Sequence, residues 1–172
     1  WYVSIDGNDS NDCLSPSTRC RTINGAIEKA TSGDAVHIAV GTYTGGDHEV
    51  VSIQKNITLS GGWNSDFTAQ NGMSTIDGQN IRAGIMVYYD FSPAIATVDH
   101  FIIQNCRSSP YDNNGGGIGV GGVLTLNNST VRNNTGDYGG AGIMNTGPLI
   151  FNNSKVGSNY GLGANPGGGI YN

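Results

Sequence analysis

The chain has 172 residues, a length that suits a single domain with enough apolar material for a continuous core. Only 12% of the residues are charged and the formal net charge is −5, which argues against nucleic acid as a partner because phosphate backbones are bound by clustered Lys and Arg. No stretch approaches the roughly 18 consecutive apolar residues of a membrane span, so we expect no transmembrane segment.

The first zone of the sequence, residues 1–44, predicts a short strand at 2–5, a polar loop, a helix and a second strand at 36–40. The helix is indicated by apolar residues at i, i+3, i+4 and i+7, namely Ile23, Ala26, Ile27 and Ala30. Gly33 follows as a stop signal. We expect this helix to lie across the first turn of the fold and to shield its apolar interior.

The second zone, residues 45–112, contains very short β-rich runs separated by turn-forming stretches. The runs are Val50–Ile53, Ile57–Leu59, Ile85–Tyr89 and Phe101–Ile103. Gly61–Asn64 and Thr75–Gly78 are interpreted as turns. Strands this short are stable only with neighbours on both sides, so this zone must belong to a larger sheet assembly.

The third zone, residues 113–172, repeats itself. The run Leu124–Val131 returns twenty-five residues later as Leu149–Val156, and Phe101–Cys106 is a fainter copy twenty-three residues before Leu124. A Gly-Ile pair precedes successive copies, at positions 117–118, 142–143 and 169–170. A period in the low twenties, built from short strands and glycine turns, predicts a solenoid.

Each copy is too small to fold alone, so the copies must stack and share one core. Stacked strands lie about 4.8 Å apart, which places equivalent residues in rows. We expect the core to contain Ile118, Leu124, Leu126 and Val131 above Ile143, Leu149, Phe151 and Val156. We also expect a hydrogen-bonded ladder of Asn105, Asn128 and Asn153, flanked by Cys106, Ser129 and Ser154.

Two other repeat or β architectures fit less well. A leucine-rich repeat needs regular Leu and a helical segment in every copy, and a β-sandwich needs hairpin turns that would not produce fixed offsets. The sequence therefore predicts an all-β fold, a single-stranded parallel β-helix with an N-terminal capping α-helix, in which residues 1–172 form one domain.

Several N-terminal segments resemble the entry segment of pectate-lyase-like right-handed β-helix proteins. They include Tyr2–Ser4, Gly7–Asp12, Thr22–Ile23 and Gly41–Tyr43. The later Gly-Gly-Ile and Leu-x-Leu-x-Asn-Ser copies resemble the repeats of bacterial surface proteins of the polymorphic-outer-membrane-protein type. The resemblance implies a right-handed β-helix whose first coil is closed by the strand and helix. It implies no single activity, because such folds include polysaccharide lyases, glycoside hydrolases, adhesins and phage spikes.

The three cysteines show no zinc-cluster spacing and suit an oxidising compartment. Cys13 stands where the resembling family usually has Gly, and Cys20 where it usually has an aromatic residue, so we predict that these two form a disulfide. Cys106 is expected to stay a buried free thiol. The chain begins at Trp1 without an initiator Met or an export signal, and we expect an extracellular or cell-surface protein whose signal peptide has been removed.

Carbohydrate chemistry needs paired carboxylates for hydrolysis, or a base with Arg or Lys and often Ca²⁺ for elimination. After Asp112 the only charged residues are Arg132, Asp137 and Lys155. The sequence therefore favours a non-catalytic structural, adhesive or self-assembling element, with a carbohydrate-active enzyme, or a fragment of one, as the alternative. A polysaccharide partner stays open, because several aromatic side chains suit either sugar stacking or coverage of the flank: Trp63, Phe67, Tyr88, Tyr89 and Phe91.

Three smaller features complete the candidate sites. Four residues with side-chain oxygens at alternating loop positions form a weak Ca²⁺ candidate, namely Asp6, Asn8, Ser10 and Asp12. The bidentate Glu of an EF-hand is missing, and Asx turns explain these four residues better. Of the glycosylation sequons, those at Asn56 and Asn133 are expected to face solvent. Residues 167–172 open a further copy, so we expect either that a longer parent chain continues with more coils, or that this uncapped C-terminal coil self-associates in a head-to-tail manner.

Overall fold

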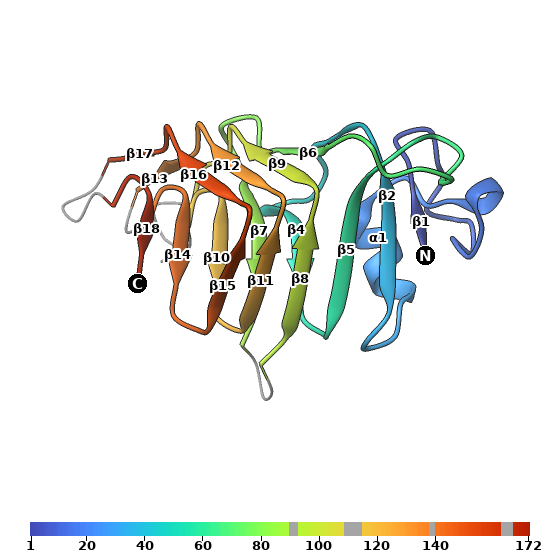
Figure 1. Ribbon diagram of the computed structural model, residues 1–172, viewed down its shortest axis with the longest axis horizontal. Coiled ribbons are helices and arrows are strands. Elements are labelled where there is room, and N and C mark those ends of the chain that lie inside the picture. Colours follow the sequence, from blue (N-terminus) through green and yellow to red (C-terminus); the bar gives the residue numbers. More distant parts are fainter. Residues whose placement is uncertain (90–92, 109–114, 138–139, 163–166) are drawn as a thin grey trace.

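The computed structural model describes residues 1–89, 93–108, 115–137, 140–162 and 167–172. Its strands stack along one axis with the two termini at opposite ends (Figure 1). The chain visits three parallel sheets in a fixed cyclic order, and each strand pairs with the equivalent strand of the next coil. This arrangement is a parallel β-helix, as the repeat predicted.

Sheet 1 contains β1 (Tyr2–Val3), β2 (Ala35–Ala39), β5 (Ile57–Trp63), β8 (Ile95–Asp99), β11 (Val123–Asn127) and β15 (Leu149–Asn152). Sheet 2 contains β3 (Thr42–Tyr43), β6 (Ser74–Asp77), β9 (Phe101–Gln104), β12 (Thr130–Arg132) and β16 (Lys155–Gly157). Sheet 3 contains β4 (Glu49–Ile53), β7 (Ala83–Val87), β10 (Ile118–Val120), β14 (Ile143–Asn145) and β18 (Ile170–Tyr171). A further pair joins β13 (Thr135–Gly136) to β17 (Tyr160–Gly161).

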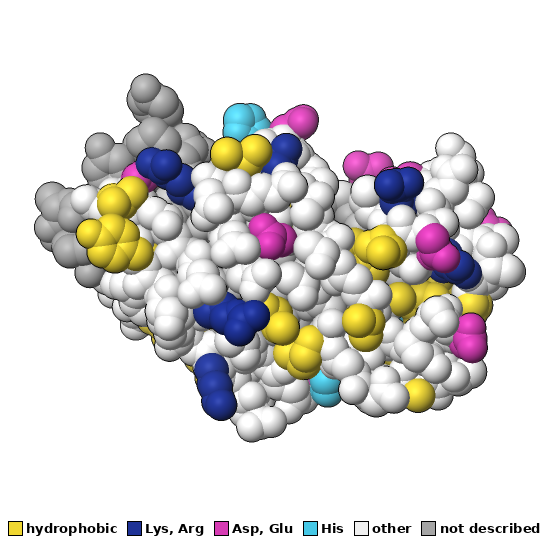
Figure 2. Space-filling model, turned by 90° about the horizontal axis from the view of Figure 1, so that it is seen from above, with side chains coloured by type: hydrophobic (Ala, Val, Ile, Leu, Met, Phe, Trp, Pro, Cys, Tyr) yellow, Lys and Arg dark blue, Asp and Glu magenta, His cyan; other side chains and the backbone are white. Residues whose placement is uncertain are grey.

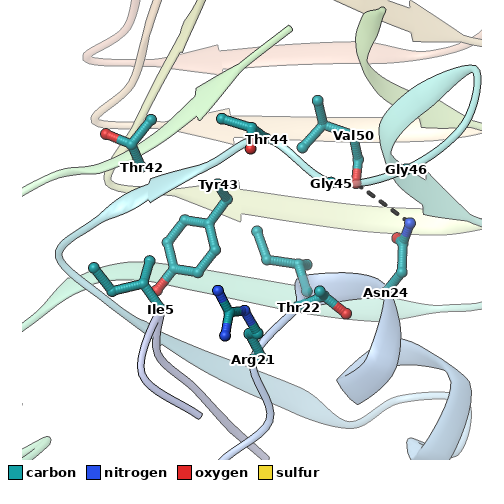
Figure 3. Close-up of a pocket in the computed structure, with 11 residues that line it drawn as sticks. Ile5, Arg21, Thr22, Asn24, Thr42, Tyr43, Thr44, Gly45, Gly46 and Val50 are labelled. Carbon is teal, nitrogen blue, oxygen red and sulfur yellow. Dashed lines mark hydrogen bonds between the residues drawn. The ribbon is translucent and has the colours of Figure 1, made fainter. Parts of the chain in front are cut away.

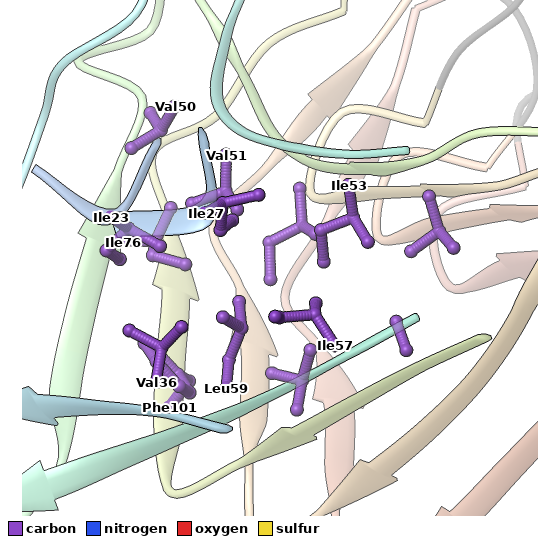
Figure 4. Close-up of a cluster of buried hydrophobic side chains, with 14 of the residues drawn as sticks. Ile23, Ile27, Val36, Val50, Val51, Ile53, Ile57, Leu59, Ile76 and Phe101 are labelled. Atoms are coloured by element: carbon purple, nitrogen blue, oxygen red, sulfur yellow. The ribbon is translucent and has the colours of Figure 1, made fainter. Parts of the chain in front are cut away.

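The core consists of apolar rows that run along the stacking axis, because alternate residues of each strand point inward (Figure 4). In sheet 1 one row joins Val36, Leu59, Val98 and Leu126, all fully buried. The predicted pairs of the repeat zone are confirmed in register, namely Ile118–Ile143, Leu124–Leu149, Leu126–Phe151 and Val131–Val156.

The recurrence of glycine before Ile118 and Ile143 in the repeat has a steric cause. A Cβ atom added at Gly117 would lie 2.6 Å from the Gly142 carbonyl oxygen, and one added at Gly142 would lie 2.7 Å from that of Gly169. Since neighbouring coils approach this closely, only glycine fits before the buried Ile118 and Ile143.

The predicted capping helix is present as α1 (Ile23–Lys29), one residue shorter than expected. The Thr22 side chain accepts the N–H of Gly25 and begins the helix, and Lys55 Nζ donates to the carbonyls of Ile27 and Ala30 at the other end. The Asn24 amide donates to Val50 and accepts from Ser52, so it pairs with the outer edge of β4 as a strand would. A 3₁₀ turn, η1 (Pro16–Thr18), lies in the preceding loop.

Several expectations for the second zone were wrong. The stretch Thr75–Gly78 was interpreted as a turn, but Ser74–Asp77 is strand β6. Strand β8 was not predicted at all. The expected turn at Gly61–Asn64 is largely the end of strand β5. Gly62 has a φ of 75° there, and the register between β2 and β5 shifts between His37 and Ala39. The boundary between the second and third zones, at residues 112 and 113, lies outside the described residues.

Candidate functional site

The C-terminal coil, defined here by β15 to β18, partly exposes apolar residues whose partners in the preceding coil are fully buried. Leu124, Leu126, Val131 and Ile143 are fully buried, whereas their partners Leu149, Phe151 and Val156 are only partly buried and Ile170 is 44% exposed. Within the described residues, nothing covers the apolar cross-section beyond β15, β16 and β18.

The backbone of the same coil is also unpaired on one side. Strands β15, β16 and β18 are the outermost members of their sheets. The amide of Leu124 donates to the carbonyl of Pro148, so in the parallel ladder the N–H and C=O groups of Leu149 and Phe151 point away from β11. Tyr160 and Leu162 add exposed apolar surface, at 68% and 51%. The open coil thus presents both a backbone template and apolar side chains.

The predicted asparagine ladder is present in part. Asn153 donates to the side-chain carbonyl of Asn128 across 2.9 Å, but Asn128 donates to Asp99 and not to Asn105. The predicted place of Asn105 in this ladder was wrong. Gln104 pairs with Arg132 of sheet 2, so Asn105 lies at the corner that follows sheet 2. There its amide donates to Asp77 across 2.8 Å. Cys106 was predicted to lie beside Ser129 in the row that flanks the ladder. Phe101 lies there instead, and its N–H donates to the Ser129 hydroxyl.

Gln70 extends this polar row toward the N-terminus. Its amide donates to Ser60, to the Gly61 carbonyl and to Asp99 at 3.3 Å. Asp99 thereby receives amides from both sides, and the row Gln70, Asp99, Asn128 and Asn153 joins successive coils along the edge of sheet 1.

A second, inward-facing asparagine row was not predicted. The buried side chain of Asn134 accepts the Cys106 N–H at 2.9 Å and donates to the carbonyl of Ile103 and to Asn159. Asn159 repeats the pattern one coil later by donating to Val131. The sequence signal was available, since Asn134 and Asn159 are twenty-five residues apart.

In the weak Ca²⁺ candidate loop, the side chains of Asp6, Asn8 and Asp12 accept hydrogen bonds from the protein. Arg19 donates to both oxygens of Asp6, at 2.9 and 2.6 Å, and this interaction holds the pKa of Asp6 well below its usual range. Asn8 accepts from the Ser10 N–H and Asp12 from the Leu14 N–H, which are Asx turns. Within the described ranges, no group of three or more His, Cys, Asp or Glu is placed to hold a metal ion.

Asp9, between these candidates, has a structural role that the sequence did not reveal. One carboxylate oxygen accepts the N–H groups of Arg21 and Thr22, both at 2.9 Å, and the other accepts the Thr22 hydroxyl. Asp9 therefore fixes the residues that begin α1 and ties the polar loop to the cap.

The predicted disulfide between Cys13 and Cys20 is confirmed. It ties the polar loop to β1, because the Tyr2 N–H donates to Cys13 and the Cys20 N–H donates to Tyr2. Cys106 is free and fully buried, and desolvation raises the pKa of its thiol to about 12.

Two of the candidate sugar-stacking aromatics, Trp63 and Phe67, belong to a ring cluster over the first coils of sheet 1. The ring of Tyr2 lies 5.1 Å from that of Phe67 and 5.5 Å from that of His37, which is 4.9 Å from Trp63. Burial within this cluster lowers the pKa of His37. The Tyr2–Phe67 and His37–Trp63 pairs are edge to face and the Tyr2–His37 pair is tilted, and these contacts among the rings favour coverage of the flank.

The other aromatic candidates are separated from that cluster. Tyr88 donates to Glu49 and Tyr89 is 65% exposed, whereas Phe91 lies outside the described residues. Both glycosylation candidates, Asn56 and Asn133, are exposed, and glycosylation of either stays a prediction. Figure 2 shows that acidic and basic side chains are scattered over one face of the solenoid and form no single patch.

No protein-family model, curated protein or solved structure matches this chain. Among the described residues, no helix is long and apolar enough to cross a membrane.

Proposed function

We propose that this chain is a non-catalytic β-helix element of an extracellular or cell-surface protein, and that it assembles through its open C-terminal coil. The observation that carries the proposal is the change from full burial at Leu126 and Ile143 to partial exposure at Phe151 and Ile170, their partners one coil later. The Cys13–Cys20 disulfide supports the location, because such bonds persist in oxidising compartments. The resemblance to pectate-lyase-like β-helices with surface-protein repeats supports the same class.

Further coils of a longer chain would cover this end, and where none follow, the occupant we propose for the open coil is the open coil of a second copy. Among the described residues, the N-terminal end leaves a free strand edge at β3 alone, since β1 is paired with Cys20 and β4 with Asn24, whereas the C-terminal end leaves β15, β16 and β18 free. This favours a tail-to-tail pair over the head-to-tail filament expected from the sequence. Strands that meet across a two-fold axis would add to each other's free edges.

Charge is compatible with this pairing. Lys155 is the only charged residue after Asp137, so two such ends would meet with little electrostatic repulsion. The surface is also rich in Asn, Ser and Gly, whose backbone can join a new strand without a bulky side chain in the way.

The arrangement of carboxylates supports a structural role. Asp77 accepts from Gln104 and Asn105, Asp99 from Gln70 and Asn128, and Asp137 from Arg107. These acidic side chains serve the ladders and flank contacts of the solenoid, and hydrolysis would instead need two carboxylates facing a common substrate groove.

Sedimentation velocity tests the proposal with two variants of equal exposure. Leu162 on the open coil and Ile95 on the flank are each 51% exposed. We expect the unmodified chain and Ile95→Lys to sediment as a dimer at high concentration, and Leu162→Lys to sediment as a monomer because a buried, unpaired charge opposes association. A monomeric unmodified chain, or equal loss of the dimer in both variants, would contradict the proposal.

A further inference from the structure

A cavity of about 360 Å³ lies at the N-terminal end of sheet 2, between β3 and the loop that precedes α1 (Figure 3). It is far along the chain from the open C-terminal coil and plays no part in the assembly proposed above. Its lining includes the apolar residues Ile5 and Val50, the polar residues Thr42 and Thr44, and a single cation, Arg21.

The cavity occupies the place where sheet 2 lacks a strand. In sheet 1, Cys20 covers the outer edge of β1, and in sheet 3 the Asn24 amide covers the outer edge of β4. Sheet 2 begins at β3, whose only strand neighbour is β6.

The free edge of β3 directs hydrogen-bonding groups into this cavity. The Thr75 N–H donates to the Gly41 carbonyl across 2.8 Å, so the parallel ladder turns the N–H and C=O groups of Thr42 away from β6. Among the residues that the structure describes, neither of these Thr42 groups has a hydrogen-bond partner. An extended segment could therefore pair with Thr42 as the next strand of sheet 2.

Arg21 supplies the charge. Its backbone N–H is fixed by Asp9 at 2.9 Å, and Figure 3 shows its guanidinium directed toward the cavity beside Tyr43. In the described part of the chain this guanidinium makes no hydrogen bond or ion pair, whereas Arg19, two residues earlier, is bound to both oxygens of Asp6. A guanidinium without a bound acidic side chain can bind a carboxylate of a ligand through two parallel hydrogen bonds.

Apolar surface lies beside the cation. Ile5 is 51% exposed although it borders the buried ring of Tyr43, and Val50 closes the opposite side of the cavity. A ligand that uses the whole site therefore needs a backbone-like row of donors and acceptors, an apolar side chain and a carboxylate.

We propose that this cavity binds an extended acidic peptide segment, which adds a strand to the free edge of β3 and places a carboxylate on Arg21. Main-chain hydrogen bonds to Thr42 hold the segment, the apolar wall accepts one of its side chains, and Arg21 selects for the acidic residue. A small inorganic anion would use Arg21 alone and leave the Thr42 groups unpaired.

The test uses the peptide acetyl-Val-Thr-Val-Glu-amide and its neutral counterpart with Gln in place of Glu, titrated into the ¹⁵N-labelled chain. We expect the acidic peptide to shift the amide signal of Thr42 and the Nε–H signal of Arg21, and to bind at least about tenfold more tightly than the neutral peptide. Arg21→Gln should remove this preference, and the matched control Arg132→Gln should keep it. Thr42→Pro, which removes an outward-facing donor at an edge strand, should weaken both peptides.

Equal affinity for the two peptides, or a preference that persists in Arg21→Gln, would overturn the proposal. So would shifts confined to Arg21 that sodium acetate reproduces, since these would indicate an isolated anion contact without strand addition. Unchanged thermal unfolding of Arg21→Gln would show that a lost preference reflects recognition and not unfolding.

Discussion

The Asn153 side chain donates to the side-chain carbonyl of Asn128 across 2.9 Å, and both residues have left-handed backbone conformations, with φ of 49° and 45°. The Asn128 side chain in turn donates to the Asp99 carboxylate of the preceding coil across 2.8 Å. The same corner of three successive coils is therefore held by side-chain hydrogen bonds. Asn tolerates this backbone conformation better than other side chains, so it serves the turn and the ladder together.

Asn128→Leu should reduce the free energy of unfolding by about 1–3 kcal/mol more than Asn127→Leu. The first change removes the amide from Asp99 and places a leucine at positive φ. The Asn127 side chain lies on β11 and accepts one exposed hydrogen bond, from Asn152. Urea unfolding of both variants measures the difference. Asn128→Gly separates the two causes, because glycine keeps the backbone conformation and loses only the hydrogen bonds. Equal unfolding midpoints for the two leucine variants would contradict the ladder.

Asn134→Leu should be more damaging still, with a loss of about 3 kcal/mol or more. The substitution leaves the Cys106 N–H and the Ile103 carbonyl buried without their partner. Asn152→Leu is the control, since Asn152 is exposed and its loss should cost about 0.5 kcal/mol or less. Similar urea midpoints for the two variants would show that the inward row contributes little.

The regular coils could be predicted from the sequence because their two copies have equal length. The offset of twenty-five residues placed Leu124 on Leu149 and Val131 on Val156 correctly. The fainter copy failed because Phe101–Gln104 was aligned with a strand of sheet 1, although it belongs to sheet 2 and pairs with β12. Both sheets carry alternating apolar residues followed by Asn, so the pattern alone does not distinguish them.

Coil length explains the other errors. Thr130 pairs with Ile102, twenty-eight residues earlier, and Leu59 pairs with Val98, thirty-nine residues later. Strand β8 lies thirty-nine residues after β5 and twenty-eight before β11, so neither offset matches the repeat of twenty-five, and its residues show no glycine or asparagine mark. The inward Asn134, the cap contact of Asp9 and the free edge of β3 depend on contacts between coils, which a single sequence with variable loops does not locate.

Cysteine alkylation should report three states of the chain. The native protein should take up no iodoacetamide, because Cys13 and Cys20 are bonded and the Cys106 thiol is buried with a pKa raised to about 12. Unfolding without reductant should allow one adduct, and unfolding with reductant three. Intact mass spectrometry counts the adducts. Rapid single alkylation of the native chain would contradict the burial of Cys106.

The Asp6–Arg19 pair should make part of the stability dependent on acid pH. Arg19 depresses the pKa of Asp6 in the folded chain, so the stabilisation is fully present above the unfolded pKa of about 3.9 and is lost as the pH falls through the lower folded value. Asp6→Asn should therefore lose less stability on acidification below about pH 4 than the unmodified chain. Thermal unfolding across this range measures the slope, with Asp47→Asn, an exposed carboxylate, as control. Parallel curves for Asp6→Asn and the unmodified chain would exclude a contribution from this pair.

Residue-resolved hydrogen exchange at low and high protein concentration tests the assembly of the open coil most directly. Within β15, the amide of Ile150 faces β11, whereas those of Leu149 and Phe151 face the open end. We predict that Ile150 is protected at both concentrations, and that Leu149 and Phe151 exchange rapidly in dilute solution and become protected in concentrated solution. Rapid exchange of Leu149 and Phe151 at every concentration, with Ile150 protected throughout, would contradict the claim that a second copy pairs with this edge.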